Sequence, residues 1–226
     1  MTEGLPVLLD LLLRLGIRGT FFTTGEMARR FPDVIRRLVH EGHELGCHGD
    51  LHQDFTTLDF AQTDTELRDS LATLRAYSSV ESFRAPYLRF PSKHLPLLVR
   101  HGLTIDSSVA RYKAGPNHRP SVTVPGLTRV AASVTSSVLR LPTMIRAPWL
   151  RGLSEPLMLF VHPWEAVDFR RSALRWDCRF RTGAAALSRW DSLLTSLRTQ
   201  GARFVPIKEL VELSFSKDRS TADAVR

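Results

Sequence analysis

The sequence predicts an α/β fold in which helices cover a parallel sheet. Short runs rich in β-branched and aromatic residues alternate with longer segments whose apolar residues recur at helical spacing. Several helical segments are followed by a glycine, the residue most common just after a helix. An alternation of strands and helices predicts a parallel sheet, either open or closed into a barrel.

The elements expected over the first half of the chain follow one another with short connections. Helices are predicted at 5–15, 31–41, 63–77 and 91–101, and strands at 17–23, 44–48, 82–84 and 103–106. Pro6 and Pro32 stand in the first turns of their helices, where the N–H that proline lacks has no partner to lose. Gly16, Gly42 and Gly102 mark the ends of three of these helices.

The alternation is lost over residues 111–156, which contain six prolines and are expected to form edge strands or long loops of an insertion. The apolar run Leu157–Val161 is typical of a strand buried on both faces of a parallel sheet. A helix at 183–199, a strand at 202–205 and a short helix at 206–213 follow. One domain over residues 1–215 and a disordered polar tail over 216–226 are therefore predicted.

Composition fits one globular domain and argues against several other classes of protein. The 226 residues are 43% hydrophobic, yet the longest apolar stretch is interrupted by Asp10 and Arg14, so no membrane span is expected. Cys47 and Cys178 lack the spacing of a disulfide framework or a structural zinc site. The formal charge of +8 is not gathered into basic runs, which argues against nucleic acid as a partner, whereas acidic polysaccharide or membrane headgroups suit it better.

Polar side chains suited to hydrolysis stand at four predicted strand ends. They are the pair His48 and His52, then Arg84 with Pro86 and Tyr87, then Asp106, and finally His162 with Trp164. Positions i and i+4 of a helical turn share a face, so the histidine pair is a candidate for binding one metal ion. Taken singly, each feature has an ordinary alternative as a solvated loop residue or a structural side chain. Because parallel α/β proteins gather strand ends at one edge, their coincidence favours a common active site.

Together these motifs resemble the NodB-type polysaccharide deacetylases of carbohydrate esterase family 4. His48-Gly-Asp-Leu-His52 resembles the histidine pair of that family, Arg84-Ala-Pro-Tyr87 its Arg-x-Pro-Tyr motif, Asp106-Ser-Ser108 its acidic strand end, and Leu159-Phe-Val-His162 its final histidine motif. The resemblance covers roughly residues 2–213, and the His-Pro-Trp-Glu run at 162–165 is most similar to the branch associated with bacterial exopolysaccharide systems. It implies a distorted (β/α)7 barrel that is incomplete at its N-terminus.

The resemblance also implies a chemistry, the metal-dependent removal of N-acetyl groups from an amino-sugar polysaccharide. It makes His48 and His52 ligands of a divalent metal, zinc first, with cobalt, manganese and nickel as alternatives. Arg84 would hold the catalytic base, and the N–H of Tyr87, in the loop stiffened by Pro86, would stabilise the oxyanion. His162 would protonate the leaving amine with help from Asp106, and Trp164 would line the acetyl pocket or serve as a structural tryptophan.

The family's first strand ends in Thr-Phe-Asp-Asp, which supplies the base and a third metal ligand, and this sequence contains no Asp-Asp pair. We therefore expect a truncated or degenerate deacetylase, inactive or weakly active as written. Asp50 and Asp54 are the carboxylates nearest to hand as substitute ligands, but the favoured interpretation of both is as ordinary loop residues. The alternatives are a noncatalytic carbohydrate-binding protein and an amidohydrolase acting on small C–N substrates. Because no secretory signal is visible, a cytoplasmic location is expected, with export through a missing N-terminus as the alternative.

Overall fold

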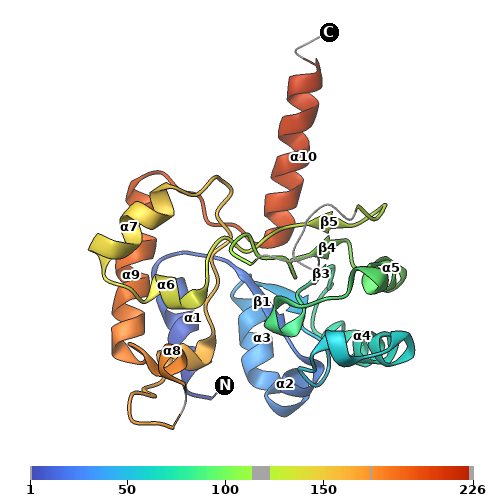
Figure 1. Ribbon diagram of the computed structural model, residues 1–226, viewed down its shortest axis with the longest axis horizontal. Helices are drawn as coiled ribbons and strands as arrows, with labels where there is room; N and C mark the ends of the chain where they lie inside the picture. The colour runs from blue at the N-terminus through green and yellow to red at the C-terminus, as the bar shows by residue number, and fades with distance from the viewer. Residues whose placement is uncertain (1, 114–122, 174, 224–226) are drawn as a thin grey trace. The chain divides into compact units, whose positions relative to one another are not determined.

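The computed structural model describes residues 2–113, 123–173 and 175–223, and Figure 1 shows its helices and strands. These residues divide into two compact units. The first, called here the sheet unit, comprises the described residues 18–109, 123–130 and 204–223. The second, called the helical unit, comprises the described residues 2–17, 110–113, 131–173 and 175–203.

Parallel strands form the centre of the sheet unit. In the described part of the chain they follow the order β1-β2-β3-β4-β5 and are β1 (Thr20–Thr23), β2 (Glu44–Cys47), β3 (Ser82–Phe83), β4 (Ile105–Asp106) and β5 (Thr128–Arg129). Cys47 is paired with Phe83, and Phe83 with Asp106. The C-terminal ends of β2, β3 and β4 are therefore level with one another, and the residues that follow them start from the same edge.

Helices and short 3-10 turns connect these strands. They are α2 (Gly25–Arg30), α3 (Pro32–His40), η1 (Phe55–Thr57), α4 (Phe60–Leu74), η2 (Pro86–Leu88), η3 (Ser92–His94), α5 (Leu95–Arg100) and α10 (Ile207–Asp223). A capping box begins α4, since the Asp59 side chain accepts from the Gln62 N–H at 2.8 Å and the Gln62 side chain accepts from the Asp59 N–H at 2.9 Å. The strands and helices predicted for residues 17–106 occur in the predicted order, with α2 as an additional helix that was not predicted, and the α/β class with a parallel sheet is confirmed.

Aromatic rings fill the core of the sheet unit next to the ends of β2 and β3. Phe55, Phe83 and Phe90 are buried, and their ring centroids lie 5.0 to 5.6 Å apart at steep angles. Edge-to-face packing of this kind is favoured because the positive edge of one ring meets the negative face of the next. The buried leucines of α4, Leu67, Leu71 and Leu74, belong to the same core. The loops that carry the candidate site therefore rest on a packed apolar floor.

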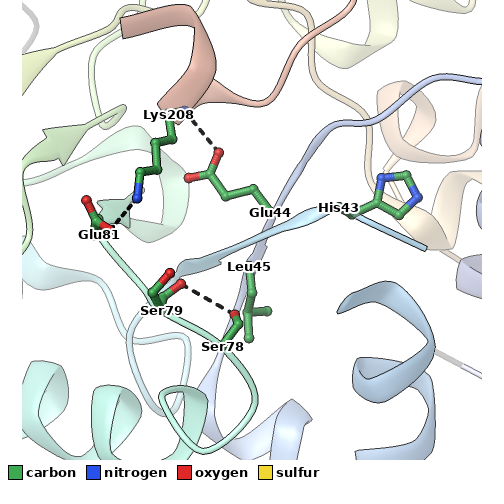
Figure 2. Close-up of a pocket in the computed structure, with 7 residues that line it drawn as sticks. All are labelled: His43, Glu44, Leu45, Ser78, Ser79, Glu81 and Lys208. Carbon is green, nitrogen blue, oxygen red and sulfur yellow. Dashed lines mark hydrogen bonds and ion pairs between the residues drawn. The ribbon is translucent and has the colours of Figure 1, made fainter. Parts of the chain in front are cut away.

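At the opposite, N-terminal edge of the sheet the Glu44 carboxylate bonds several elements, and Figure 2 shows its contact with Lys208. Glu44, the first residue of β2, accepts from Thr20 Oγ1 at 2.8 Å, Ser82 Oγ at 2.6 Å and the Lys208 N–H at 3.0 Å. The Lys208 ammonium lies 2.5 Å from a Glu81 carboxylate oxygen, and this hydrogen bond raises the lysine pKa. These contacts border a cavity of about 130 Å³ and tie the start of α10 to the sheet.

Helices and loops make up the described part of the helical unit. Its elements are α1 (Gly4–Arg14), α6 (Ser136–Leu139), α7 (Thr143–Arg151), η5 (Pro163–Ala166), α8 (Trp176–Arg179) and α9 (Ala184–Thr199). The apolar face of α1, with Leu5 and Leu9 buried, packs inside this unit, where α1 contacts η5 and α9. An Arg14–Asp191 ion pair of 3.0 Å joins α1 to α9. None of the described helices combines the length and the apolar character that a membrane span needs.

Two predictions for the second half of the chain are wrong and a third holds only in part. Residues 157–161 are coil, because the hydrogen bonds described for this run join only Met158 to Ser133 and no strand ladder forms. Residues 202–205 are also coil. In the 111–156 region β5 is an edge strand, as predicted, but the helices α6 and α7 were not expected there, and Pro148 lies inside α7. The single domain ending at residue 215 stays a prediction. Of the tail predicted to be disordered, residues 216–223 belong to helix α10, and residues 224–226 lie outside the described residues.

Candidate active site

The ends of β2, β3 and β4 bring several of the predicted site residues to one edge of the sheet unit. His48 directly follows β2, Arg84 directly follows β3, and Asp106 is the last residue of β4. The His48 Nδ1–H donates to the Arg84 carbonyl oxygen at 2.5 Å, and the Arg84 N–H donates to the Cys47 carbonyl at 3.0 Å. The side chain of one motif is therefore bonded to the main chain of the next.

The two histidines of the pair lie against each other, but not on a helical turn as their spacing predicted. Their ring centroids are 5.0 Å apart with an interplanar angle of 68°, and residues 48–54 form an irregular loop. Gly49 has φ of 78°, and His52 has φ of 58°, a left-handed value uncommon for a residue with a side chain. The left-handed backbone at these two positions, rather than the helical repeat, brings the rings together.

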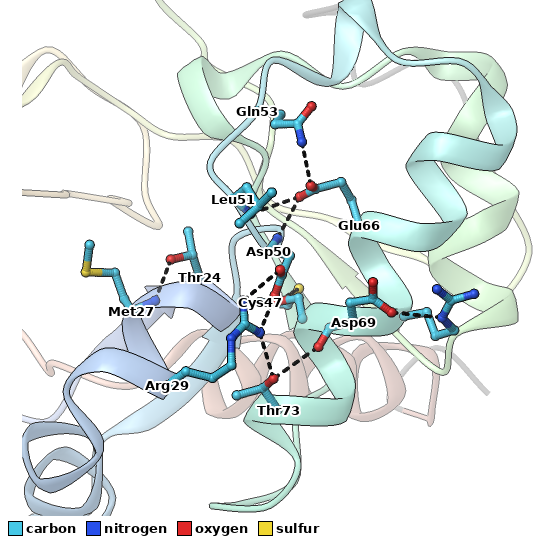
Figure 3. A network of polar contacts seen from close by, with 12 residues as sticks. Thr24, Met27, Arg29, Cys47, Asp50, Leu51, Gln53, Glu66, Asp69 and Thr73 are labelled. Atoms are coloured by element: carbon cyan, nitrogen blue, oxygen red, sulfur yellow. Dashed lines mark hydrogen bonds and ion pairs between the residues drawn. The ribbon is translucent and has the colours of Figure 1, made fainter.

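The Glu66 carboxylate of α4 holds this loop through several hydrogen bonds (Figure 3). Glu66, 6% exposed, accepts from the Asp50 N–H at 2.8 Å, the Leu51 N–H at 3.1 Å and the Gln53 Nε2 at 2.8 Å. These donors all lie between or just after the two histidines. A buried carboxylate is stable only when such donors replace the water it has lost, so Glu66 and the loop depend on each other.

The two carboxylates considered as substitute metal ligands are engaged elsewhere. Asp50 forms a two-point ion pair with Arg29, each N–O distance being 2.8 Å, and this hydrogen-bonded partner raises the pKa of Arg29. Asp54 accepts from the Thr56 N–H at 3.0 Å and from its hydroxyl at 2.7 Å, and it lies 3.4 Å from Arg89. Both carboxylates therefore support the loop that follows β2.

The described residues place two imidazoles close together where a metal site was predicted. The His48 ring donates from Nδ1 to the Arg84 carbonyl, and a main-chain carbonyl partner of this kind is usual for a histidine that binds a metal ion. Two imidazoles are fewer than the three protein ligands of a hydrolytic zinc site. Among the residues with described positions, no group of three or more His, Cys, Asp or Glu could hold a metal ion. The donor set present here does not by itself complete such a site.

Arg84 and Asp106 are both buried at the floor of this edge. The Arg84 guanidinium donates to the Ser107 carbonyl at 3.2 Å and to the Ser107 hydroxyl at 2.8 Å, and it lies over the Phe22 ring at 4.5 Å. Asp106 is fully buried and accepts from Arg129 Nε at 2.9 Å and from the Ser108 N–H at 2.9 Å. The partners described for the Asp106 carboxylate thus belong to the sheet unit itself.

The loop after β3 is strained at its tip. Tyr87 and Leu88 have φ of 60° and 53°, although neither is a glycine. The Ala85 N–H donates to the Ser108 hydroxyl at 2.8 Å, and Pro86 follows at the first position of η2, so the start of the loop is fixed. The Tyr87 ring is 56% exposed and lies 5.2 Å from the His52 ring. Consecutive left-handed residues cost energy, and such strain is common at functional sites.

His162 and Trp164 belong to the helical unit, where they form a cluster of their own. The two rings are stacked, 5.4 Å apart with an interplanar angle of 23°. His162 Nδ1 lies 2.7 Å from a carboxylate oxygen of Glu165, a residue not included in the predicted site. The sequence did contain a signal for it, because proline is favoured at the first position of a helical turn and glutamate at the third position can bond back to the N-cap residue. The meeting of His162 with the histidine pair stays a prediction.

The sheet unit is thus a parallel α/β structure with imidazole, guanidinium and carboxylate groups beyond its C-terminal strand ends, where enzymes of this class carry their active sites. Residues 1–105, just under half of the chain, match the family model described as polysaccharide deacetylase, and over these residues the chain is similar to that family.

Curated relatives and solved structures are also similar to the chain. The chain is 33% identical over 116 residues, 49% of its length and 34% of the other's, to a peptidoglycan deacetylase-like protein of Gibberella zeae. Matches to curated relatives span from 24% to 59% of those proteins' lengths. The structure of the Bacillus subtilis peptidoglycan deacetylase PdaC, as a D285S mutant, is similar with a TM-score of 0.68 and 15% identity, covering 99% of this chain and 91% of that one.

A family 4 pseudoenzyme from Bacillus anthracis is similar at a TM-score of 0.65 and 16% identity, covering 92% of this chain and 60% of that one. At these identities the structural likeness shows the fold alone. The polysaccharide deacetylase type predicted for the fold is confirmed.

Proposed function

We propose that the chain is part of a hydrolase that removes N-acetyl groups from an amino-sugar polysaccharide. The observation that carries the proposal is the 2.5 Å hydrogen bond from His48 to the Arg84 carbonyl, which joins two predicted motifs at the strand ends of the family-matched region. A divalent metal, zinc first, is part of the proposal, with His48 and His52 as two of its ligands. When bound, such an ion polarises a carbonyl and activates water.

The side chains present here supply positioning and proton transfer in this proposal. Arg84 is fixed by Ser107 and Phe22, so its charge is held at the floor of the site, where it would orient a carboxylate base. The exposed Tyr87 ring offers an apolar face to a sugar, and its N–H is the candidate oxyanion donor. His162 would give the proton from Nε2 to the amine nitrogen as the C–N bond breaks. Its action on the same amide as the histidine pair is part of the proposal.

A noncatalytic carbohydrate-binding protein is the second candidate. This candidate is favoured because the described residues offer the two imidazoles of His48 and His52 but no group of three residues that could hold a catalytic metal ion. The sequence also contains no Asp-Asp pair to supply a base. In this case the exposed Tyr87 and the loop around it would hold a sugar chain without cleaving its acetamide. A cytoplasmic location, with export as the alternative, is proposed for either function.

Acetate release from chito-oligosaccharides and from N-acetylated peptidoglycan, compared with small cyclic and linear amides, tests the proposal. Two proteins are needed: the chain as printed, and a version carrying a strand that ends in Thr-Phe-Asp-Asp ahead of residue 2. We expect zinc-stimulated acetate release from the sugar substrates by the extended protein and little or none by the chain as printed. His48→Ala should abolish the release, whereas His40→Ala, on the surface of α3, should not.

Sugar binding by both proteins without acetate release from either would support the binding protein instead. Turnover of small amides alone would identify an amidohydrolase of narrower substrate class. Either result would contradict the polysaccharide deacetylase proposal.

A further inference from the structure

His162 is held by a short local motif in the helical unit. Pro163 begins the 3-10 turn η5, and the Glu165 N–H donates to the His162 carbonyl at 2.9 Å. The Glu165 carboxylate then turns back, accepting from the His162 N–H at 3.2 Å and meeting the His162 ring at Nδ1 at 2.7 Å. One carboxylate oxygen therefore binds both the main chain and the side chain of the same histidine.

The charge that faces His162 is buried and has a partner of its own. Glu165 has no exposed surface, and its second oxygen lies 2.9 Å from Nε of Arg140, whose side chain is 2% exposed. A carboxylate in such surroundings is costly unless a positive group and hydrogen bonds compensate it. Arg140 supplies the positive charge beside one Glu165 oxygen, and the His162 ring supplies a hydrogen bond to the other.

Arg140 is in turn fixed by main-chain carbonyls. Its guanidinium donates to the carbonyls of Asp177 at 2.9 Å, Cys178 at 3.2 Å and Phe180. These carbonyls lie in and just after α8, so the arginine cannot swing away from Glu165 without losing three acceptors. The row of His162, Glu165 and Arg140 is therefore anchored at its buried end.

The exposed end of the row is the His162 ring. Its side chain is 47% exposed, with Trp164 stacked on one side and the Phe160 ring meeting it edge-on at 5.6 Å. An ionised carboxylate can only accept, so Nδ1 carries a hydrogen and Nε2 is the nitrogen left to act on other groups. The orientation and the tautomer of the ring follow from the same contact.

We propose that Glu165, backed by Arg140, is the positioning residue for His162, the role the family resemblance implied for Asp106. This inference rests on the proposed function and deepens it. When His162 acts as an acid, the Nε2 hydrogen passes to the leaving amine nitrogen and the ring returns to the neutral form that keeps its hydrogen on Nδ1. Glu165 holds that hydrogen throughout, as the carboxylate of a hydrolase triad orients its histidine.

The tautomer of His162 tests the inference on the chain as printed, without any metal or substrate. Protein labelled with ¹⁵N-histidine is examined by imidazole ¹H–¹⁵N correlation spectra at about pH 9, where histidine is neutral. The signals of His162 are those that disappear in His162→Gln. In the wild type we expect the Nδ1–H tautomer to dominate. In Glu165→Gln the ratio of Nδ1–H to Nε2–H should fall about tenfold or more, since a charge-assisted hydrogen bond is lost.

Asp168→Asn is the matched control, because Asp168 is another carboxylate of the same segment and pairs on the surface with Arg170. It should leave the His162 spectrum unchanged. Because Glu165→Gln leaves the Arg140 charge buried and unpaired, Arg140→Met/Glu165→Met provides a second variant without that charge, and the ratio should fall there too. A dominant Nε2–H tautomer in the wild type, or an unchanged ratio in the folded variants, would overturn the inference.

Acetate release by the extended protein separates this inference from the proposed function. If Glu165→Gln lowers kcat at least tenfold with little change in KM, while Asp168→Asn does not, the positioning role extends to catalysis. If all forms lack activity, the deacetylase proposal fails, yet the tautomer result still supports or overturns the placement of the Nδ1 hydrogen by Glu165.

Discussion

His48 donates its Nδ1 hydrogen to the main-chain carbonyl of Arg84 at 2.5 Å, although the two residues are 36 positions apart in the sequence. The contact exists because β2 and β3 are parallel neighbours with Cys47 opposite Phe83, so the next residue of each strand emerges at the same level. The residues that follow β2 and those that follow β3 are thereby joined into one candidate site, although neither motif was distinctive by itself. The His48–Arg84 contact can persist only if the loop that follows His48 keeps its conformation.

Glu66 is expected to be the main support of that loop. Glu66→Ala removes the acceptor of two backbone N–H groups and of Gln53, and it should lower the free energy of unfolding by about 2–4 kcal/mol. Urea denaturation measures this, and amide hydrogen exchange at Asp50 and Leu51 should accelerate in parallel. Asp69→Ala, on the exposed side of α4, is the control and should change stability by less than about 1 kcal/mol. Equal losses in the two variants would contradict the role given to Glu66.

The buried ion pair between Asp106 and Arg129 is expected to behave differently from the surface pairs. Arg129→Met leaves the fully buried Asp106 carboxylate without its cation, which should cost about 3–5 kcal/mol in unfolding free energy. Arg36→Met removes the exposed pair with Asp33 and should cost less than about 1 kcal/mol. The double variant Arg129→Met/Asp106→Leu should recover most of the loss. If it is no more stable than Arg129→Met, charge burial is not the cause.

The parts of the fold that local pattern determines were predictable. The strands and helices between residues 17 and 106 follow from apolar periodicity, from Pro32 at the start of α3 and from Gly42 and Gly102 after the helices. Leu157–Val161 had an equally strong apolar pattern, yet a strand also needs a neighbour with free N–H and carbonyl groups. Which segment lies beside it is decided by tertiary structure, and a single apolar run carries no information about that.

The sequence predicted which strand ends carry the candidate site residues. It did not predict the hydrogen bonds and ring contacts among them. The spacing of His48 and His52 suggested a helical turn, whereas the left-handed φ of His52 is imposed by the loop that Glu66 holds. Glu165 was missed although it lies only three residues after His162. The family pattern pointed to Asp106 as the acidic partner, and the burial that makes Glu165 effective becomes visible only once Arg140 is placed beside it.

The Cys47 thiol is expected to make the protein less stable at high pH. Burial raises the pKa of this thiol from 9.0 to about 11, so the folded state keeps it protonated where the unfolded state ionises. Its contribution is complete below about pH 9 and is lost as pH rises towards 11, a loss of about 2–3 kcal/mol. Urea denaturation at about pH 8 and pH 10.5 measures it. Cys47→Ala should show a smaller decrease, and an equal decrease would assign the effect to other groups.

A glycine at position 4 is expected to be required for the close packing of α1 against η5 in the helical unit. A Cβ at this position would lie 2.0 Å from the Pro163 carbonyl oxygen, so Gly4→Ala must displace the main chain beside His162. Alanine ordinarily favours a helix by about 1 kcal/mol over glycine, but overpacking against main chain should make the variant less stable by about 1–3 kcal/mol. Gly19→Ala, where the Cβ meets nothing within 4 Å, should change stability by less than about 0.5 kcal/mol.

Thermal denaturation compares these two glycine variants, and the imidazole spectrum of His162 provides a second, local measurement. The His162 signals should shift in Gly4→Ala, because the residue that the new methyl group displaces follows His162 directly in the chain. They should stay in place in Gly19→Ala. A stable Gly4→Ala protein with an unshifted His162 spectrum would mean that α1 can move aside without disturbing the turn, and that the close approach of Gly4 to Pro163 does not hold the histidine in position.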